Sequence, residues 1–328
     1  MPTHSGVIFQ NISFRLRFAL TILFTIFWSQ NSPAEFDLEC YIKGDCRHSV
    51  GGGSSANPSA GNEIRLNPAA VPTEKGLGIE AINYSTTEWS VVQGLGWAGA
   101  AISPANSEET FFGPPAIEYS TDYLNRYIAA RKYESQKYTL ASAFKLIDKS
   151  GSGLSRFNLN LGAMIKYNKY TARITPGGGL TGSMGPFLFG YSYYLDETQL
   201  DPQLNSSLRP PASRYSVQTF NVGLYLTSMV LNYSNLQMTP ENSSTPPSTV
   251  TVIMASLLTQ RFIFNLAART EDSSRPWYNP ETSTLVLKQI KKEYFGGIQY
   301  RFTKNLMAGT FYNYYLFQEL SLTATLFF

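Results

Sequence analysis

The last ten residues constrain the fold of this chain more than any other stretch. Apolar and polar side chains alternate strictly along them, which predicts a β-strand with one apolar and one polar face. A strand of a membrane barrel needs this pattern, because one face meets lipid, the other faces a polar lumen, and aromatic residues lie at the membrane boundary. A half-buried edge strand of a soluble β-protein is the alternative. The apolar face comprises Leu320, Leu322, Ala324, Leu326 and Phe328.

The composition favours the membrane interpretation. Only 15% of the residues are charged, whereas roughly 25% is usual in a soluble domain. The 21 tyrosines and 21 phenylalanines are enough to build aromatic girdles at both membrane boundaries. The net charge of +3 is small and spread along the chain, so we expect no nucleic-acid partner.

Residues 1–34 are predicted to be an export signal that is cleaved after Ala34. Arg15 and Arg17 precede an apolar run over 18–28, which is too short to cross a bilayer of ~30 Å as a helix. An uncleaved anchor helix is the alternative. Cys40 and Cys46 follow the cleavage point, and an exported chain meets an oxidising compartment, so we predict a small disulfide loop. A metal pair is the weaker alternative, because the spacing matches no zinc site.

The remainder divides into an irregular segment, 35–76, and a strand-rich body, 77–328. The first is rich in Gly, Ser, Asn and Pro, and the second alternates with a period of two, most clearly over 157–168. We predict an all-β fold, a transmembrane antiparallel up-and-down β-barrel of about ten strands, or twelve if two more lie in 103–136. The expected strands are 77–84, 89–102, 137–148, 156–174, 180–195, 215–236, 249–269, 286–303, 306–315 and 319–328.

Short periplasmic turns should alternate with longer extracellular connections. On this basis 303–305 and 175–179 are predicted to be periplasmic turns, and 196–214 and 270–285 extracellular loops. The connection 237–248 falls on the periplasmic side of this assignment, although it is too long for that side. A barrel of about ten strands would be narrow and would hold a plug or a small ligand rather than an open pore.

Catalysis is not predicted. The chain has two histidines, His4 and His48, neither of them in the strand-rich body, and Ser183 lacks the glycine two positions before it that a nucleophile elbow needs. We therefore expect no enzyme activity, no catalytic residue, no cofactor and no metal. Asp196 is expected to be a solvated acid at a strand end. Basic residues are expected at a strand mouth, within reach of lipopolysaccharide phosphates: Lys288, Lys291 and Lys292.

The sequence Asn67-Pro68-Ala69-Ala70 lies just before the first expected strand. Asn before Pro is held away from helix, and two alanines allow close backbone packing, although a plain turn is the simpler interpretation. With the Gly-rich stretch before it, this element resembles the Asn-Pro-Ala element of the long-chain fatty-acid transporter (FadL-type) family, and it is similar to that of PorV-like barrels. The resemblance implies an N-terminal plug that includes these four residues, apolar ligands inside the barrel, and lateral exit through a kinked strand. The terminal strand resembles the signature that the barrel-assembly machinery reads.

These expectations together describe a bacterial outer-membrane barrel. The predicted function is passive uptake of hydrophobic small molecules such as fatty acids. The expected partners are outer-membrane lipids and lipopolysaccharide, the assembly machinery, and a hydrophobic ligand. The alternative is a structural or assembly protein that anchors a surface or secretion partner through loops 103–136 or 196–214.

Overall fold

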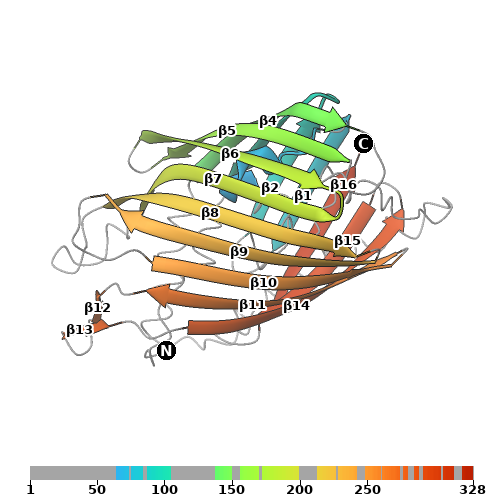
Figure 1. The fold of residues 1–328 in the computed structure, drawn as a ribbon. Helices are drawn as coiled ribbons and strands as arrows, with labels where there is room; N and C mark the ends of the chain where they lie inside the picture. Colours follow the sequence, from blue (N-terminus) through green and yellow to red (C-terminus); the bar gives the residue numbers. More distant parts are fainter. Residues whose placement is uncertain are drawn as a thin grey trace, which may run out of the picture.

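The computed structural model describes residues 64–73, 75–83, 87–104, 137–149, 156–169, 172–198, 213–226, 228–241, 248–259, 261–273, 276–279, 284–287, 291–303, 306–313 and 320–327. Within them, fourteen antiparallel strands form a closed barrel (Figure 1). They are β1 (Gly76–Asn83), β2 (Thr87–Gly94), β3 (Ala98–Pro104), β4 (Lys137–Lys149), β5 (Phe157–Asn168), β6 (Arg173–Met184), β7 (Phe187–Thr198), β8 (Ser213–Leu226), β9 (Met229–Pro240), β10 (Ser248–Leu258), β11 (Phe262–Ser273), β14 (Lys291–Thr303), β15 (Leu306–Asn313) and β16 (Leu320–Phe327).

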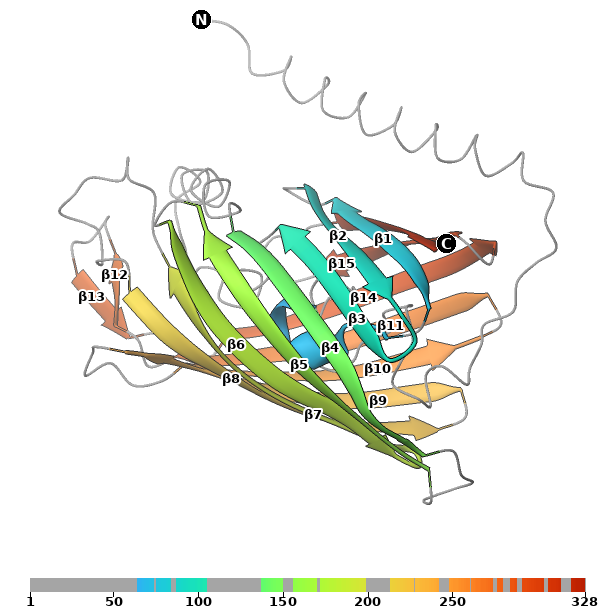
Figure 2. The same ribbon diagram turned by 90° about the horizontal axis from the view of Figure 1, so that it is seen from above.

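Each strand pairs with its neighbour in the chain, and the barrel closes between its first and last strands. The register of β1 with β16 runs from Gly78 opposite Phe327 to Asn83 opposite Leu322. A separate two-stranded sheet, β12 (Pro276–Asn279) and β13 (Thr284–Leu287), lies within the connection from β11 to β14. A short 3₁₀ helix, η1 (Pro68–Ala70), lies inside the barrel (Figure 2).

The predicted number of about ten or twelve strands is wrong. Expected strands 89–102, 180–195, 215–236 and 249–269 are each a hairpin or most of one, and only residues 95–97, 185–186, 227–228 and 259–261 separate the two strands of each. Apolar and polar residues alternate in both strands of such a hairpin. A short turn shifts which positions are apolar, but it leaves no polar gap that would mark the end of the first strand. With fourteen strands, the barrel is also wider than the narrow one expected from the sequence.

Two predicted connections are also corrected. Residues 175–179 form no turn, because they lie inside β6, paired with β5 from Thr175 opposite Lys166 to Gly179 opposite Gly162. Residues 237–240 belong to β9, and the remaining link to β10 lies at the end opposite the tight turns. That end also holds the longest connections, 105–136, 199–212 and 274–290, whereas only residues 304 and 305 separate β14 from β15. Tight turns at one end and long connections at the other are typical of outer-membrane barrels.

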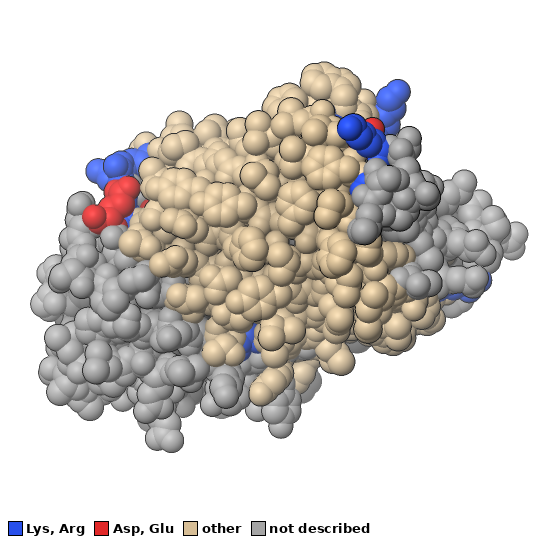
Figure 3. All heavy atoms as spheres, in the orientation of Figure 1, with Lys and Arg blue, Asp and Glu red and all other residues tan. Residues whose placement is uncertain are grey.

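The outer surface of the barrel is apolar. Outward side chains of the central strand positions are large and exposed; Ile253 is 59% and Leu266 is 68% accessible. On the face drawn in Figure 3, charged side chains gather mainly at the two ends. Exposed aromatic residues lie toward both ends of the strands: Trp97, Phe187 and Phe262 by the tight turns, and Tyr138, Tyr167, Tyr193 and Tyr294 toward the long connections.

This exterior has the arrangement that lipid requires: an apolar band between two aromatic girdles. In contact with water, so large an apolar area would be strongly unfavourable. The chain is therefore a β-barrel of the bacterial outer membrane. Among the described residues, no helix is long and apolar enough to cross a membrane.

The C-terminal alternation is confirmed over the residues that the structure describes. In β16, Leu322 and Leu326 are exposed on the outer face, and Thr323 and Thr325 are buried on the inner face. Ala324 lies between the two leucines and is half-buried. The strand begins at Leu320, whereas Phe328 lies outside the described residues. Recognition of this strand by the assembly machinery stays a prediction.

Candidate functional site

Residues 64–73 lie against the inner wall of the barrel. The side chain of Asn67 accepts a hydrogen bond from the backbone N–H of Ala69 at 3.1 Å, which caps η1, and Pro68 at the first helical position supplies a φ suited to that turn. The Asn67 amide also donates to the carbonyl of Leu180 on β6 at 3.2 Å. The predicted motif therefore forms a compact local structure that is attached directly to the wall.

Four further hydrogen bonds join this segment to the wall. Arg65 donates to Ser103 at 2.8 Å, and Thr181 donates to the carbonyl of Ala69 at 3.0 Å. Ser192 donates to the carbonyl of Leu66, and the N–H of Gly96 donates to the carbonyl of Thr73 at 2.6 Å. The wall partners come from β3, β6, β7 and the turn between β2 and β3, so the segment crosses several strands rather than following one.

The segment lies over a row of small inward-facing residues that are register partners across five neighbouring strands. The row comprises Gly99, Ala143, Gly162, Gly179 and Ser192. A Cβ added to Gly162 would overlap the backbone of Pro68 and Ala69, and one added to Gly179 would overlap the Asn67 side chain. Because Gly162 and Gly179 lack a side chain, residues 64–73 can lie close to the backbone of the wall. The glycine at 179 therefore has a structural reason other than a turn.

Part of the inner wall is apolar. The apolar side chains point inward from three adjacent strands, in the half of the barrel near the long connections, and they are almost fully buried. Ile64 and Leu66 belong to the same buried apolar cluster as these wall residues. We call these wall residues the apolar patch: Tyr215 and Val217 on β8, Leu236 and Met238 on β9, and Val250, Val252 and Met254 on β10.

The barrel wall is split between β6 and β7. Their pairing stops at Gly177 opposite Tyr194, whereas β6 stays paired with β5 as far as Arg173 and β7 stays paired with β8 as far as Thr198. Pro176 occupies the first unpaired position of β6, and it has no N–H to donate to a neighbouring strand. We call the unpaired ends, 173–176 and 195–198, the fork.

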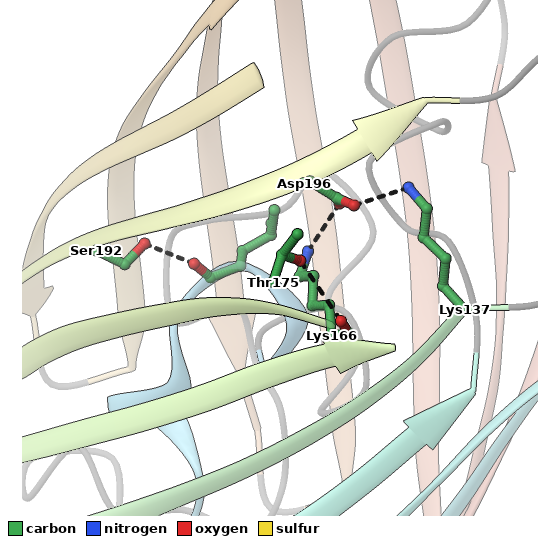
Figure 4. A network of polar contacts seen from close by, with 6 residues as sticks. Lys137, Lys166, Thr175, Ser192 and Asp196 are labelled. Carbon is green, nitrogen blue, oxygen red and sulfur yellow. Dashed lines mark hydrogen bonds and ion pairs between the residues drawn. The ribbon is translucent and has the colours of Figure 1, made fainter. Parts of the chain in front are cut away.

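Buried ion pairs join the two sides of the fork (Figure 4). Asp196 on β7 pairs with Lys137 on β4 at 2.9 Å and with Lys166 on β5 at 3.3 Å. The Lys166 ammonium also lies 3.9 Å from the centre of the Tyr194 ring, in cation–π geometry. The expectation that Asp196 is a solvated acid is therefore wrong, because its strand turns it toward two lysines inside the barrel.

Replacing Asp196 with asparagine should destabilise the barrel, because it leaves two buried lysines without their carboxylate. Removing one partner of a buried pair typically costs about 3–5 kcal/mol. The temperature at which the folded, fast-migrating gel band disappears should fall clearly. Asp148→Asn is the matched control, because Asp148 and Lys145 form an exposed pair at 3.2 Å. Equal shifts in the two variants would contradict a stabilising role for the buried pairs.

The sequence-predicted site residues have different outcomes. The structure places Asn67, Pro68, Ala69 and Ala70 together at the inner wall, and whether they close the lumen is a matter for proposal. Cys40, Cys46, His48 and Lys288 lie outside the described residues, as do 1–34 and 105–136. Lys291 and Lys292 begin β14. Sequence reasoning missed two buried lysines of the inner wall, Lys137 and Lys166. The alternating pattern of their strands places both on the inward face, and this signal could have identified them.

No family model matches the chain, and no curated protein matches it. Among solved structures, the CymD monoaromatic hydrocarbon channel matches with a TM-score of 0.44 and 8% identity over 87% of this chain and 96% of that one. An outer-membrane channel from Pseudomonas putida F1 gives 0.41 and 9% over 78% and 96%. A loop-deletion mutant of OmpT of Vibrio cholerae gives 0.42 and 7% over 77% and 97%. Scores at this level establish neither a shared family nor a shared function.

Proposed function

We propose that this barrel is an outer-membrane channel for the passive uptake of hydrophobic small molecules. The apolar patch is the observation that carries the proposal. A barrel that conducts water-soluble solutes has a polar interior, whereas here seven inward positions on three neighbouring strands carry Val, Leu, Met and Tyr, beside polar ones such as Thr219 and Asn232. Such a surface lowers the free energy of an apolar guest by removing it from water. Fatty acids, the ligands that the resemblance implies, are one subset of this class.

In this proposal the segment 64–73 is a plug that a ligand displaces. Ile64 and Leu66 are buried in the same apolar cluster as the patch, and in this proposal an entering hydrophobic molecule competes with them for that surface. The segment is attached by a few hydrogen bonds, and each contributes only about 1 kcal/mol net. A ligand that buries a comparable apolar area is therefore sufficient to release it.

The fork supplies a lateral exit. Its strand ends lack pairing with each other, so separating them breaks no ladder hydrogen bonds between the described residues. A hydrophobic molecule that leaves the apolar patch by this route passes into lipid without crossing the polar end of the lumen. The buried Asp196 ion pairs then hold the two sides together between passages.

Uptake of labelled n-decane tests the proposal through the patch residue Val252. Val252→Asn puts an amide into the apolar patch. The Ser234 hydroxyl opposite it can meet only part of the amide's hydrogen-bonding capacity, and a buried polar group with unmet hydrogen bonds costs about 1–3 kcal/mol. We expect uptake by a deletion strain expressing this variant to fall about tenfold relative to wild type. Thr323→Asn is the matched control, an inward-facing site on β16. Undiminished decane uptake in Val252→Asn, at equal amounts of folded barrel, would rule out the patch as the route.

The structural or assembly alternative depends on loops 103–136 and 196–214, and most of both lies outside the described residues. The decane assay separates the two functions, because an anchoring protein requires no apolar surface inside its barrel.

A further inference from the structure

A polar site adjoins the apolar patch on the inner wall, at Asn221 and Ser234. These two residues are direct register partners across β8 and β9. Asn221 is 5% accessible and Ser234 is 0% accessible. Among the described residues, neither the Asn221 side-chain oxygen nor the Ser234 hydroxyl has a hydrogen-bond partner. Buried polar groups normally find partners, because leaving one unpaired is costly.

The pair lies in a row of register partners that runs from Gly190 on β7 to the buried Arg269 on β11. In the register, Asn221 lies opposite Gly190 on β7, and Ser234 lies opposite Val252 of the apolar patch. Leu236, also in the patch, is the next inward-facing residue along β9. A molecule seated on the patch therefore reaches two hydrogen-bonding groups at one end, beside the apolar side chains of Val252 and Leu236. The Thr219 hydroxyl, in the register position opposite Leu236, is already hydrogen-bonded to Ser192.

The plug segment covers this site as well. A Cβ placed on Gly190 would lie 3.3 Å from the side-chain nitrogen of Asn221 and 3.3 Å from that of Asn67, so the two amides lie over the same glycine. Displacing residues 64–73 would remove the Asn67 amide from beside Asn221. The polar site would then open together with the apolar patch.

We infer that Asn221 and Ser234 form the head-group site for an uncharged hydroxyl, so that the preferred ligands are apolar molecules that carry an alcohol. This inference rests on the proposed function and narrows its substrate class. A hydroxyl both donates and accepts, so it satisfies the amide oxygen and the serine hydroxyl together. A carboxylate has no hydrogen to donate to the Asn221 amide oxygen, and the nearest cation in the row, Arg269, lies beyond Val252, two strands from Ser234.

Equilibrium binding of labelled 1-decanol, decanoate and n-decane to the purified full-length barrel in amphipol tests the inference. The wild-type protein should bind decanol about tenfold more tightly than decane, as expected for one or two buried hydrogen bonds, and more tightly than decanoate. Asn221→Leu and Ser234→Ala should each reduce the preference for decanol over decane several-fold. Thr323→Val is the control, and gel mobility before and after boiling verifies that each variant is folded.

The outcomes separate the two levels of the argument. If wild type binds decane and decanol equally, or if both variants keep the wild-type preference, the hydroxyl site is wrong and the hydrophobic channel stands. A preference for decanoate over decanol would also overturn the hydroxyl site. If wild type binds neither decane nor decanol, the proposed function itself fails and the head-group site fails with it.

Discussion

Replacing Gly162 with alanine is expected to raise outer-membrane permeability to nitrocefin about tenfold. The added Cβ would overlap the backbone of Pro68 and Ala69, and neither the β5 backbone nor the capped turn can yield cheaply. Overpacking of this kind costs about 1–3 kcal/mol, which shifts the equilibrium between a docked and a displaced segment by about tenfold or more. Hydrolysis by a periplasmic β-lactamase in intact cells measures the permeability.

Gly178→Ala is the matched control for this substitution. Gly178 is the next residue to Gly179 on β6, and its added Cβ would meet only the Gly162 carbonyl, at an ordinary 3.5 Å. Permeability should stay at the wild-type value in this variant. If the two alanine variants behave alike, whether both leaky or both tight, the segment 64–73 is not what limits passage through the lumen.

A disulfide across the fork is expected to abolish decane uptake, and a reductant should restore it. Continuing the register of Gly177 with Tyr194 would bring Ile174 opposite Glu197, so Ile174→Cys with Glu197→Cys links the two unpaired ends. This pair leaves Pro176 and the Asp196 ion pairs in place. Both substitutions are made in a chain with Cys40 and Cys46 replaced by serine, and uptake is measured before and after dithiothreitol.

The control disulfide joins two strands that are already paired. Ser216 on β8 and Thr239 on β9 are register partners, at the same end of the barrel as the fork, so Ser216→Cys with Thr239→Cys should leave uptake unchanged. Normal decane uptake through a fully cross-linked fork would exclude the lateral exit and would direct attention to the polar end of the lumen.

The sequence was sufficient to predict a membrane barrel because lipid on one side and a lumen on the other impose a period of two on every strand. It was insufficient for the strand number, because tight turns such as 227–228 join strands that both alternate. Gly185–Pro186 did carry a turn signal, but the aromatic alternation after it suggested a continuous strand. Pro176 and the glycines after it misled in the opposite direction. Pro176 stands where β6 and β7 stop pairing, Gly177 lies against the side chains of Tyr194 and Met164, and Gly179 lies against Asn67.

The site was predictable only in part. Asn67-Pro68 was recognised because Asn caps and Pro starts a turn locally, without reference to distant residues. The Asp196 ion pairs join residues from strands β4, β5 and β7, and the apolar patch comes from three strands. Such groupings depend on the register between strands, because a shift of one residue turns inward side chains outward. The sequence prediction misplaced several turns, so it could not identify which residues meet on the inner wall.

The most direct test of the account is the reactivity of a cysteine at Leu66 with a water-soluble maleimide, in a chain with Cys40 and Cys46 replaced by serine. Leu66 is fully buried in the structure. Labelling should be slow without ligand and at least about tenfold faster in saturating n-decane, while a cysteine at the buried, inward-facing Thr323 should show no change. Equal labelling of the Leu66 position with and without decane would contradict displacement of the segment by a hydrophobic ligand.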